Sequence, residues 1–228
     1  MKKKKKLYLL HTVQNFMDVT HKPYALPFLE DNPYVEIQNM LDTSLLADTV
    51  AHGSVPASVS SRILSYILGA EESGADMLLL TCTSVDAGMK YVKEFTDLPT
   101  LCISQPMVEA ALDLGNRIGL VGTVPTSPAS IITPLRAAAE DRGMNPDDLQ
   151  IAVEVANGAF EARMSGDDAT HDGLVSKALM KLAQENELDA ICFAQASMSA
   201  AVHDDPGIPV LKLGQSAFDA AAKMLAEL

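Results

Sequence analysis

The stretch "ADMLLLTCTS", from Ala75 to Ser84, joins an acidic residue, a short apolar run and a small polar cluster that ends in serine. A second stretch, "LDAICFAQAS" from Leu188 to Ser197, has the same order of residue types. Cys82 of the first stretch corresponds to Gln195 of the second, 113 residues further along the chain (82 to 195). A short apolar run bounded by polar and small residues is typical of a buried strand. The two stretches therefore predict a repeated strand that ends in a polar turn.

The repeat continues after both turns. The sequence "LPTLCISQPMVEAA" follows the first turn, and the similar sequence "IPVLKLGQSAFDAA" follows the second. Each copy has a proline before a short apolar run and a glutamine after it, which predicts another strand followed by a helix. Two copies of one such unit predict two pseudo-symmetric lobes.

Apolar runs alternate with stretches of helical periodicity along the rest of the chain. We expect strands at residues 7–13, 34–41, 76–82, 100–104, 117–123, 149–155, 189–194 and 209–214. We expect helices at residues 55–74, 128–142, 172–186 and 216–228. The alternation predicts an α/β fold in which each lobe is a mostly parallel sheet flanked by helices. Runs without alternating polar residues fit strands that are covered on both faces.

Composition narrows the class of protein and its partners. The chain has 228 residues, of which 48% are apolar and 21% charged, as in ordinary globular proteins. A formal net charge of −13 disfavours nucleic acids and anionic membranes as partners. Three cysteines cannot form a disulfide framework, so we expect free thiols and a cytoplasmic location. The lysine run in "MKKKKKLYLL" precedes too few apolar residues for a secretory signal, and we interpret it as a solvated leader.

Cys82 is the residue with the clearest chemical potential. It ends a predicted strand and precedes a helix that we expect to begin near Ser84. Ligand sites of α/β sheets form at the carboxyl ends of strands. The N–H groups at a helix start favour anions, so we expect them to lower the pKa of the Cys82 thiol. The alternative is a small buried hydrophobic residue, which is our interpretation of Cys102 and Cys192 in mid-strand.

Motifs of other enzyme classes are absent from the sequence. There is no glycine-rich dinucleotide fingerprint, Walker loop or nucleophile elbow. The five histidines show no metal-ligand spacing with cysteine or aspartate. His171 and Asp172 are adjacent, so we expect them to point in different directions and to mark a helix start rather than a catalytic pair. His203, in "HDDPG", is expected in a surface loop.

Together these motifs resemble the aspartate/glutamate/hydantoin racemase superfamily over nearly the whole chain. "GADMLLLTCTS" is similar to the family's first cysteine motif, and "LDAICFAQAS" is similar to the second, with Gln195 where the second cysteine belongs. The resemblance implies two pseudo-symmetric lobes, an active site in the cleft between them, and catalysis without metal or other cofactor. It also implies an exchange at the chain end, with residues 1–98 and 210–228 in the first lobe and residues 99–209 in the second.

The same resemblance implies the site residues. Cys82 and Gln195 take the catalytic positions, and Glu161 in "GAFEARMSGD" corresponds to an acidic helper. The substrate-binding positions in the first half of the chain correspond to His11 and Thr12 in "YLLHTV", Asp42 and Ser44 in "LDTSLL", and Thr83 and Ser84 in "GADMLLLTCTS". Those in the second half correspond to Thr123 and Thr126 in "IGLVGTVPTS" and to Ala196 and Ser197 in "LDAICFAQAS". His11 departs from the acidic residue that the glutamate enzymes have at this position.

Because position 195 holds a glutamine, the sequence alone does not determine which reaction the protein catalyses. In two-cysteine enzymes a thiolate removes the proton α to a carboxylate or carbonyl and a second thiol returns one, but Gln195 can neither give nor take a proton. We expect a cofactor-independent isomerase or racemase-like enzyme with Cys82 as the acid/base, in which His11 or Glu161 could substitute for the second base. The alternatives are a one-base decarboxylase or lyase and a catalytically silent carboxylate-binding module. The expected partners are a small carboxylate or amino-acid-like substrate and further copies of the chain.

Overall fold

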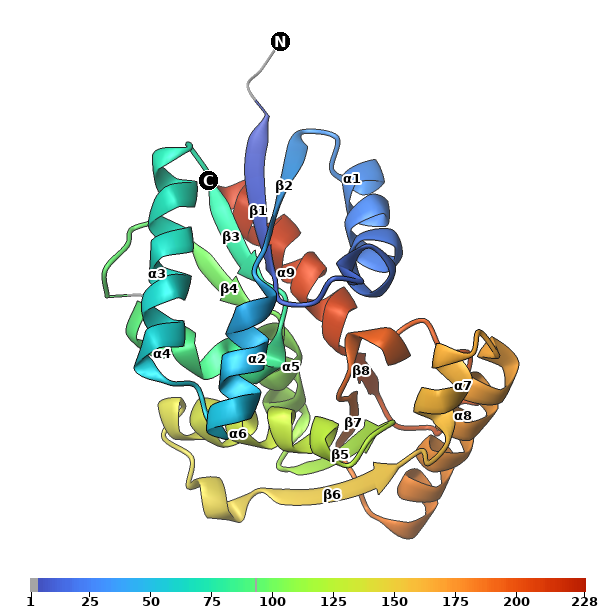
Figure 1. Ribbon diagram of the computed structural model, residues 1–228. Helices are drawn as coiled ribbons and strands as arrows, with labels where there is room; N and C mark the ends of the chain where they lie inside the picture. The colour runs from blue at the N-terminus through green and yellow to red at the C-terminus, as the bar shows by residue number, and fades with distance from the viewer. Residues whose placement is uncertain (1–3, 93) are drawn as a thin grey trace. The chain divides into compact units, whose positions relative to one another are not determined.

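The computed structural model describes residues 4–92 and 94–228, which divide into two compact units (Figure 1). The first unit holds the chain up to Ser104 together with Ala217–Leu228, and the second holds Gln105–Ser216. Residues 1–3 of the predicted lysine leader lie outside the described residues, whereas Lys5 already begins the first strand. In the described part of the chain, no helix combines the length and the apolar character needed to cross a bilayer.

Each unit contains one parallel four-stranded sheet, and all eight expected strands are confirmed (Figure 1). The first sheet has the order β2 (Val35–Leu41), β1 (Lys5–His11), β3 (Met77–Leu80) and β4 (Thr100–Cys102). The second has the order β6 (Gln150–Val155), β5 (Arg117–Gly122), β7 (Ala190–Phe193) and β8 (Val210–Lys212). The two sheets therefore have one topology, as the sequence repeat predicts.

The strand registers repeat as well. Leu10 of β1 pairs with Leu80 of β3, and Val121 of β5 pairs with Phe193 of β7. These pairs occupy corresponding places near the carboxyl ends of their strands. The polar turns that follow are therefore held in corresponding positions in the two units.

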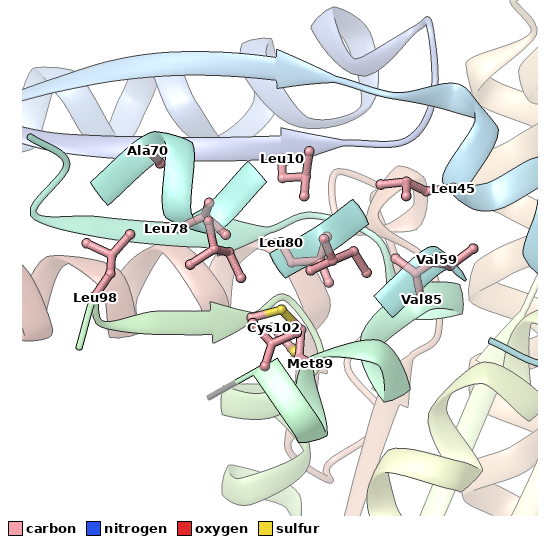
Figure 2. Packing of buried hydrophobic residues seen from close by; sticks show 13 residues of the cluster. Leu10, Leu45, Val59, Ala70, Leu78, Leu80, Val85, Met89, Leu98 and Cys102 are labelled. Carbon is pink, nitrogen blue, oxygen red and sulfur yellow. The ribbon is translucent and has the colours of Figure 1, made fainter. Parts of the chain in front are cut away.

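Helix α3 (Ala57–Glu72) contributes to the hydrophobic core of the first unit, and the spacing of its apolar residues explains why this segment is helical. Its buried residues Val59, Ile63, Ile67 and Ala70 recur at helical spacing and form one apolar stripe. This stripe packs against Leu10, Leu78 and Leu80 of the sheet in one hydrophobic cluster, part of which is labelled in Figure 2. The cluster extends to the segment after β3, which comprises the 3-10 helix η2 (Thr83–Gly88) and α4 (Met89–Val92).

Other helices of the first unit follow β1 and β2. They are η1 (Met17–Ala25), α1 (Leu26–Asp31) and α2 (Thr43–His52). In the second unit the helices are α5 (Gln105–Leu114), α6 (Thr126–Asp141), η3 (Pro146–Asp148), α7 (Ala159–Met164), α8 (Asp168–Glu185) and η4 (Ala196–Met198). Val175, Leu179 and Leu182 of α8 pack on the second sheet with Val121, Ile191 and Phe193.

The chain-end exchange differs from the prediction, which gave residues 99–209 to the second lobe and 210–228 to the first. Strand β4 pairs with β3 and stays in the first unit, and β8 pairs with β7 and stays in the second. Each fourth strand thus joins the sheet of the strand that precedes it, as consecutive strands usually do. Only the C-terminal part of α9 (Leu213–Glu227) belongs to the first unit, where the ring of Phe218 contacts Tyr24 and Phe28.

Candidate active site

The predicted site residues follow the carboxyl ends of strands in both units. In the first unit, His11 ends β1 and Thr12 follows it, Asp42 and Ser44 follow β2, and Cys82, Thr83 and Ser84 follow β3. In the second unit, Thr123 and Thr126 follow β5, Glu161 follows β6, and Gln195, Ala196 and Ser197 follow β7. Parallel strands bring these ends to one edge of each sheet. The structure therefore gathers the first set at the edge of the first sheet and the second set at the edge of the second.

Cys82 precedes η2 as its cap residue and is a free cysteine of intermediate exposure. Its burial against the hydrophobic cluster raises the pKa of the thiol, and the nearby Asp86 carboxyl raises it further. The Thr12 hydroxyl and the backbone N–H of Ser84 work in the opposite direction without cancelling the effect of burial. The expectation of a lowered pKa is therefore wrong, because desolvation outweighs the polar groups of a short helix.

Among the neighbours of Cys82, Thr12 gives the clearest indication of a ligand-binding position. Its side chain is 2% exposed, and its Oγ1 has no hydrogen-bond partner of standard geometry among the described residues. The Thr12 hydroxyl nevertheless lies close enough to Cys82 to lower the pKa of the thiol as a hydrogen-bonding neighbour. Buried hydroxyls almost always have a partner, so an unpartnered one beside a thiol indicates a place where a ligand or water completes the bonding.

Asp86 is a member of this site that the sequence interpretation missed. It lies in η2, is 9% exposed, and accepts a hydrogen bond from the Ser104 hydroxyl through Oδ2. Burial raises its pKa to about 7. The signal in the sequence is the single acidic residue of "TCTSVDAG", four positions after the cysteine.

His11 is held too firmly to serve as a free base. The ring is 1% exposed, its Nδ1 lies 2.9 Å from Thr81 Oγ1, and its Nε2 lies 2.9 Å from Asn39 Oδ1. It also stacks on Phe16 with ring centroids 4.2 Å apart. Burial lowers the pKa of this imidazole, which favours the neutral form. His11 thus ties together the carboxyl ends of β1, β2 and β3.

Asp42 caps the helix that follows β2. It accepts the backbone N–H of Ser44 at 2.9 Å and the Tyr66 hydroxyl at 3.1 Å, and Arg62 lies 3.7 Å away. Burial acts to raise the pKa of Asp42, but the hydrogen bonds from Ser44 and Tyr66 and the Arg62 charge lower it overall. The Ser44 hydroxyl is also shared by Asp42 and Arg62. Both predicted residues therefore have partners that hold the start of α2.

Gln195 is fixed by its side-chain carbonyl. Oε1 accepts the Thr123 N–H at 2.7 Å, the Thr123 hydroxyl at 2.9 Å and the Ser127 hydroxyl at 2.9 Å. Three donors around Oε1 leave Nε2 as the end of the side chain that can donate to a ligand. Thr123 and Gln195 correspond, by register, to Thr12 and Cys82 of the first unit. The repeated positions hold a thiol in one unit and an anchored amide in the other.

Gly122 allows this anchoring. A Cβ atom at Gly122 would lie 2.5 Å from Ser127 Oγ and 2.9 Å from Pro128 Cδ. Real side chains do not approach so closely, so only glycine lets the start of α6 lie against β5 and brings Ser127 to Gln195.

Two predicted residues of the second unit are more exposed than Gln195, whereas Ala196 and Ser197 are partly buried as it is. Glu161 lies in the first turn of α7, and Thr126 is the first residue of α6; both side chains are exposed. His171 and Asp172 do not point apart as expected. The His171 Nδ1 lies 2.9 Å from Asp172 Oδ1, and Asp172 Oδ2 accepts the Val202 N–H at 3.0 Å, because the short carboxylate folds back inside a helix that already begins at Asp168.

A separate hollow in the second unit lies at the opposite edge of its sheet. It is lined by Arg117 at the start of β5, by residues 150–152 of β6 and by residues 186–188. None of the predicted site residues lines it. Arg117 is itself paired with Asp189, 2.6 Å away, and with Glu187.

The sequence of this chain matches the Asp/Glu/Hydantoin racemase family over residues 41–221. This match covers most of the chain, and it includes both polar turns and the strands that lead to them. The chain belongs to the Asp/Glu/Hydantoin racemase family. None of the proteins of curated function matches it in sequence.

Solved structures agree on the fold. An aspartate racemase homologue from Pyrococcus horikoshii OT3 matches at 11% identity with a TM-score of 0.70, covering 97% of this chain and 99% of that one. An allantoin racemase from Klebsiella pneumoniae matches at 15% identity with a TM-score of 0.67, covering 98% of this chain and 88% of that one. A glutamate racemase from Bacillus anthracis matches at 14% identity with a TM-score of 0.64, covering 99% of this chain and 83% of that one. At these identities the likeness shows the shared fold alone.

Proposed function

We propose that this chain is a cofactor-independent isomerase that moves a proton at the carbon α to a carboxylate or carbonyl of a small, amino-acid-like substrate. Membership of a racemase family supports this class of chemistry. The observation that carries the proposal is the pair formed by Cys82 and Thr12. A free cysteine of intermediate exposure lies beside a buried hydroxyl without a partner, at the edge of the sheet where α/β folds bind ligands.

Cys82 is the proposed acid/base. Its raised pKa keeps it as a thiol at neutral pH, so the resting group is a proton donor. The thiolate that it leaves is a correspondingly strong base, able to take a proton from an acidified carbon. One residue can thus take and return a proton on the same face of a substrate.

Inversion at carbon needs a second acid or base on the other face. Gln195 has no titratable group, and its amide hydrogens instead suit an anionic oxygen. His11 uses both ring nitrogens, and Glu161 is an exposed side chain of α7. We therefore favour a proton shift on one face of the substrate over racemisation of a free amino acid.

Decarboxylation is the second candidate, and the protonated state of Cys82 favours it. The bond from the α carbon to a carboxylate breaks, CO2 leaves, and the electron pair stays on carbon. The Cys82 thiol then gives its proton to that carbon, and solvent returns a proton to the thiolate. This reaction needs one acid and no second base, which the residues around Cys82 can supply.

A screen in D2O tests the proposal. Small dicarboxylates, hydantoins and amino acids are incubated with the protein and with Cys82→Ala, followed by mass and chiral analysis. An isomerase gives a deuterium-labelled isomer of the substrate and releases no CO2. A decarboxylase introduces one deuterium into the product for each CO2 that it releases. Turnover that persists in Cys82→Ala, or the absence of any exchange with the whole panel, would overturn the proposal and favour a carboxylate-binding module.

A further inference from the structure

A buried carboxyl group lies one turn after the proposed acid/base. Asp86 comes from the same short helix that follows Cys82 and has 9% of its surface exposed. The Ser104 hydroxyl, just beyond β4, donates to Oδ2, whereas Oδ1 is buried and has no partner among the described residues. A buried carboxyl group with one unpartnered oxygen lowers the stability of the folded protein. Its presence close to a thiol therefore indicates a functional role.

The surroundings of Asp86 stabilise its charge only weakly. Cys102 lies with its Sγ 4.0 Å from the Asp86 backbone oxygen and, like Ser104, favours the carboxylate. Cys102 itself belongs to the hydrophobic cluster together with Val85 and Met89 (Figure 2). Val85 and Met89 precede and follow Asp86 in the sequence. The carboxyl therefore meets two polar neighbours inside an otherwise apolar wall.

The charged side chains of the neighbouring elements have other contacts. Helices α2 and α3 both contact η2. The Arg62 guanidinium of α3 pairs with Asp48 of α2, His52 at the end of α2 bonds within its own loop, and Lys90 of α4 is exposed. In the part of the chain that the structure describes, Asp86 therefore forms no ion pair with a cation, and Cys82 is the titratable neighbour whose pKa its charge raises.

Asp86 and Cys82 consequently compete in their ionisation. Burial raises the pKa of Asp86 to about 7, against the smaller opposing effects of Ser104 and Cys102. The charge of the Asp86 carboxylate in turn raises the pKa of the Cys82 thiol. The first proton lost near neutral pH therefore leaves Asp86, and the resulting charge disfavours a thiolate.

We infer that Asp86 is a positioning residue that holds Cys82 in its protonated form, through a buried carboxylate that Ser104 anchors beside the thiol. This inference deepens the proposed function and rests on it for the use made of the Cys82 proton. It assigns Cys82 the role of a proton donor in the resting protein. Asp86 itself need not touch the substrate.

Alkylation of the folded protein tests the inference without any substrate. Iodoacetamide labelling is followed from pH 6 to 10, and mass spectrometry reads Cys82 separately from Cys192, whose fully buried thiol is the internal control. The Asp86→Asn variant keeps the size of the side chain and removes its charge. We expect its Cys82 profile to move to lower pH, so that the Cys82 thiol reacts faster near pH 7 than in the parent.

Ser104→Ala provides an independent variant. It removes the hydrogen bond that favours the carboxylate, so Asp86 ionises at higher pH and Cys82 reacts faster than in the parent near neutral pH. At the alkaline end both proteins carry the charge and should react alike. A purely structural change in Ser104→Ala would instead alter the labelling rate at every pH, the alkaline end included.

Two results would overturn the inference: an unmoved Cys82 inflection in Asp86→Asn, or a shift to higher pH. If Asp86→Asn does not fold, a Ser104→Ala variant in which Cys82 reacts no faster than in the parent near neutral pH does the same. The readout concerns protonation alone, so it can succeed even where Cys82→Ala retains turnover. Failure of the proposed function and failure of this inference are thereby distinguished.

Discussion

The Gln195 side chain offers a test in which its two ends are changed separately. In Gln195→Leu the Thr123 N–H and hydroxyl lose their acceptor, while the Ser127 hydroxyl keeps the Val124 carbonyl at 2.7 Å. Leaving a buried N–H without a partner costs about 1–3 kcal/mol, and a lost hydroxyl bond costs about 1 kcal/mol more. We therefore expect unfolding of the second unit to become easier by about 2–4 kcal/mol.

Gln195→Glu is the matched variant. Its carboxylate accepts the same three hydrogen bonds, so at pH 7 we expect stability within about 1 kcal/mol of the parent. It loses the two amide hydrogens of Nε2, and binding of an anionic ligand at this position should weaken. The pKa of the new carboxylate is lowered by its three donors, so its stability contribution is present above the ordinary glutamate pKa and lost as pH falls through the lowered value.

Urea unfolding gives the free energies, and native-state hydrogen exchange at Thr123 gives the local effect. We expect Thr123 protection to fall in Gln195→Leu and to persist in Gln195→Glu. Gln150→Leu, at an exposed glutamine of the same unit, is the control for the change of side-chain type. Equal stability of Gln195→Leu and the parent, or equal loss in both Gln195 variants, would refute the assignment of the oxygen as the anchoring atom.

Three further variants test the parts of the fold that hold the site. Gly122→Ala should displace the start of α6 and weaken the Ser127 contact to Gln195, seen as loss of amide protection in α6 while the first unit is unchanged. Ile63→Ala removes a fully buried side chain from the cluster below Cys82 and should cost about 2–5 kcal/mol in urea unfolding, whereas a cost below about 1 kcal/mol would contradict the packing. Asp189→Asn removes the carboxylate whose pKa is lowered by Arg117. This carboxylate stabilises the parent above the unfolded aspartate pKa, and the stabilisation is lost as pH falls through the lowered folded pKa, so plots of unfolding free energy against pH should converge in acid. Plots that stay parallel would contradict the pairing.

Local sequence patterns predicted the strands better than the helices around them. The apolar runs of β3, β5 and β7 became strands that are buried along nearly their whole length, so burial and sequence agree there, whereas the edge strands β2 and β6 are partly exposed. Residues 17–31 form η1 and α1, which were not expected, because Pro23 and Pro27 interrupt a segment without a helical stripe. Tertiary packing through Tyr24 and Phe28 on Phe218 supports these helices, and that partner lies at the other end of the chain.

The candidate site was predictable in position and less so in electrostatics. The strand-end rule placed Cys82 after β3 and the sequence repeat placed Gln195 after β7, whereas Thr12 and Thr123, which came from the family resemblance, lie just after strands that were expected to include them. The direction of the Cys82 pKa could not be read from the sequence, because it depends on burial against α3 and on Asp86. Asp86 in turn depends on Ser104, 18 residues away, which only the pairing of β3 with β4 brings near.

The central claim is that the Cys82 sulfur carries the proton that this protein transfers. The most direct measurement is the rate at which solvent deuterium enters the carbon of an active substrate from the D2O panel, compared among the parent, Cys82→Ser and Cys192→Ala. We predict that exchange is lost in Cys82→Ser and retained in Cys192→Ala, whose thiol lies buried in β7. Exchange at the parent rate in Cys82→Ser would contradict the claim.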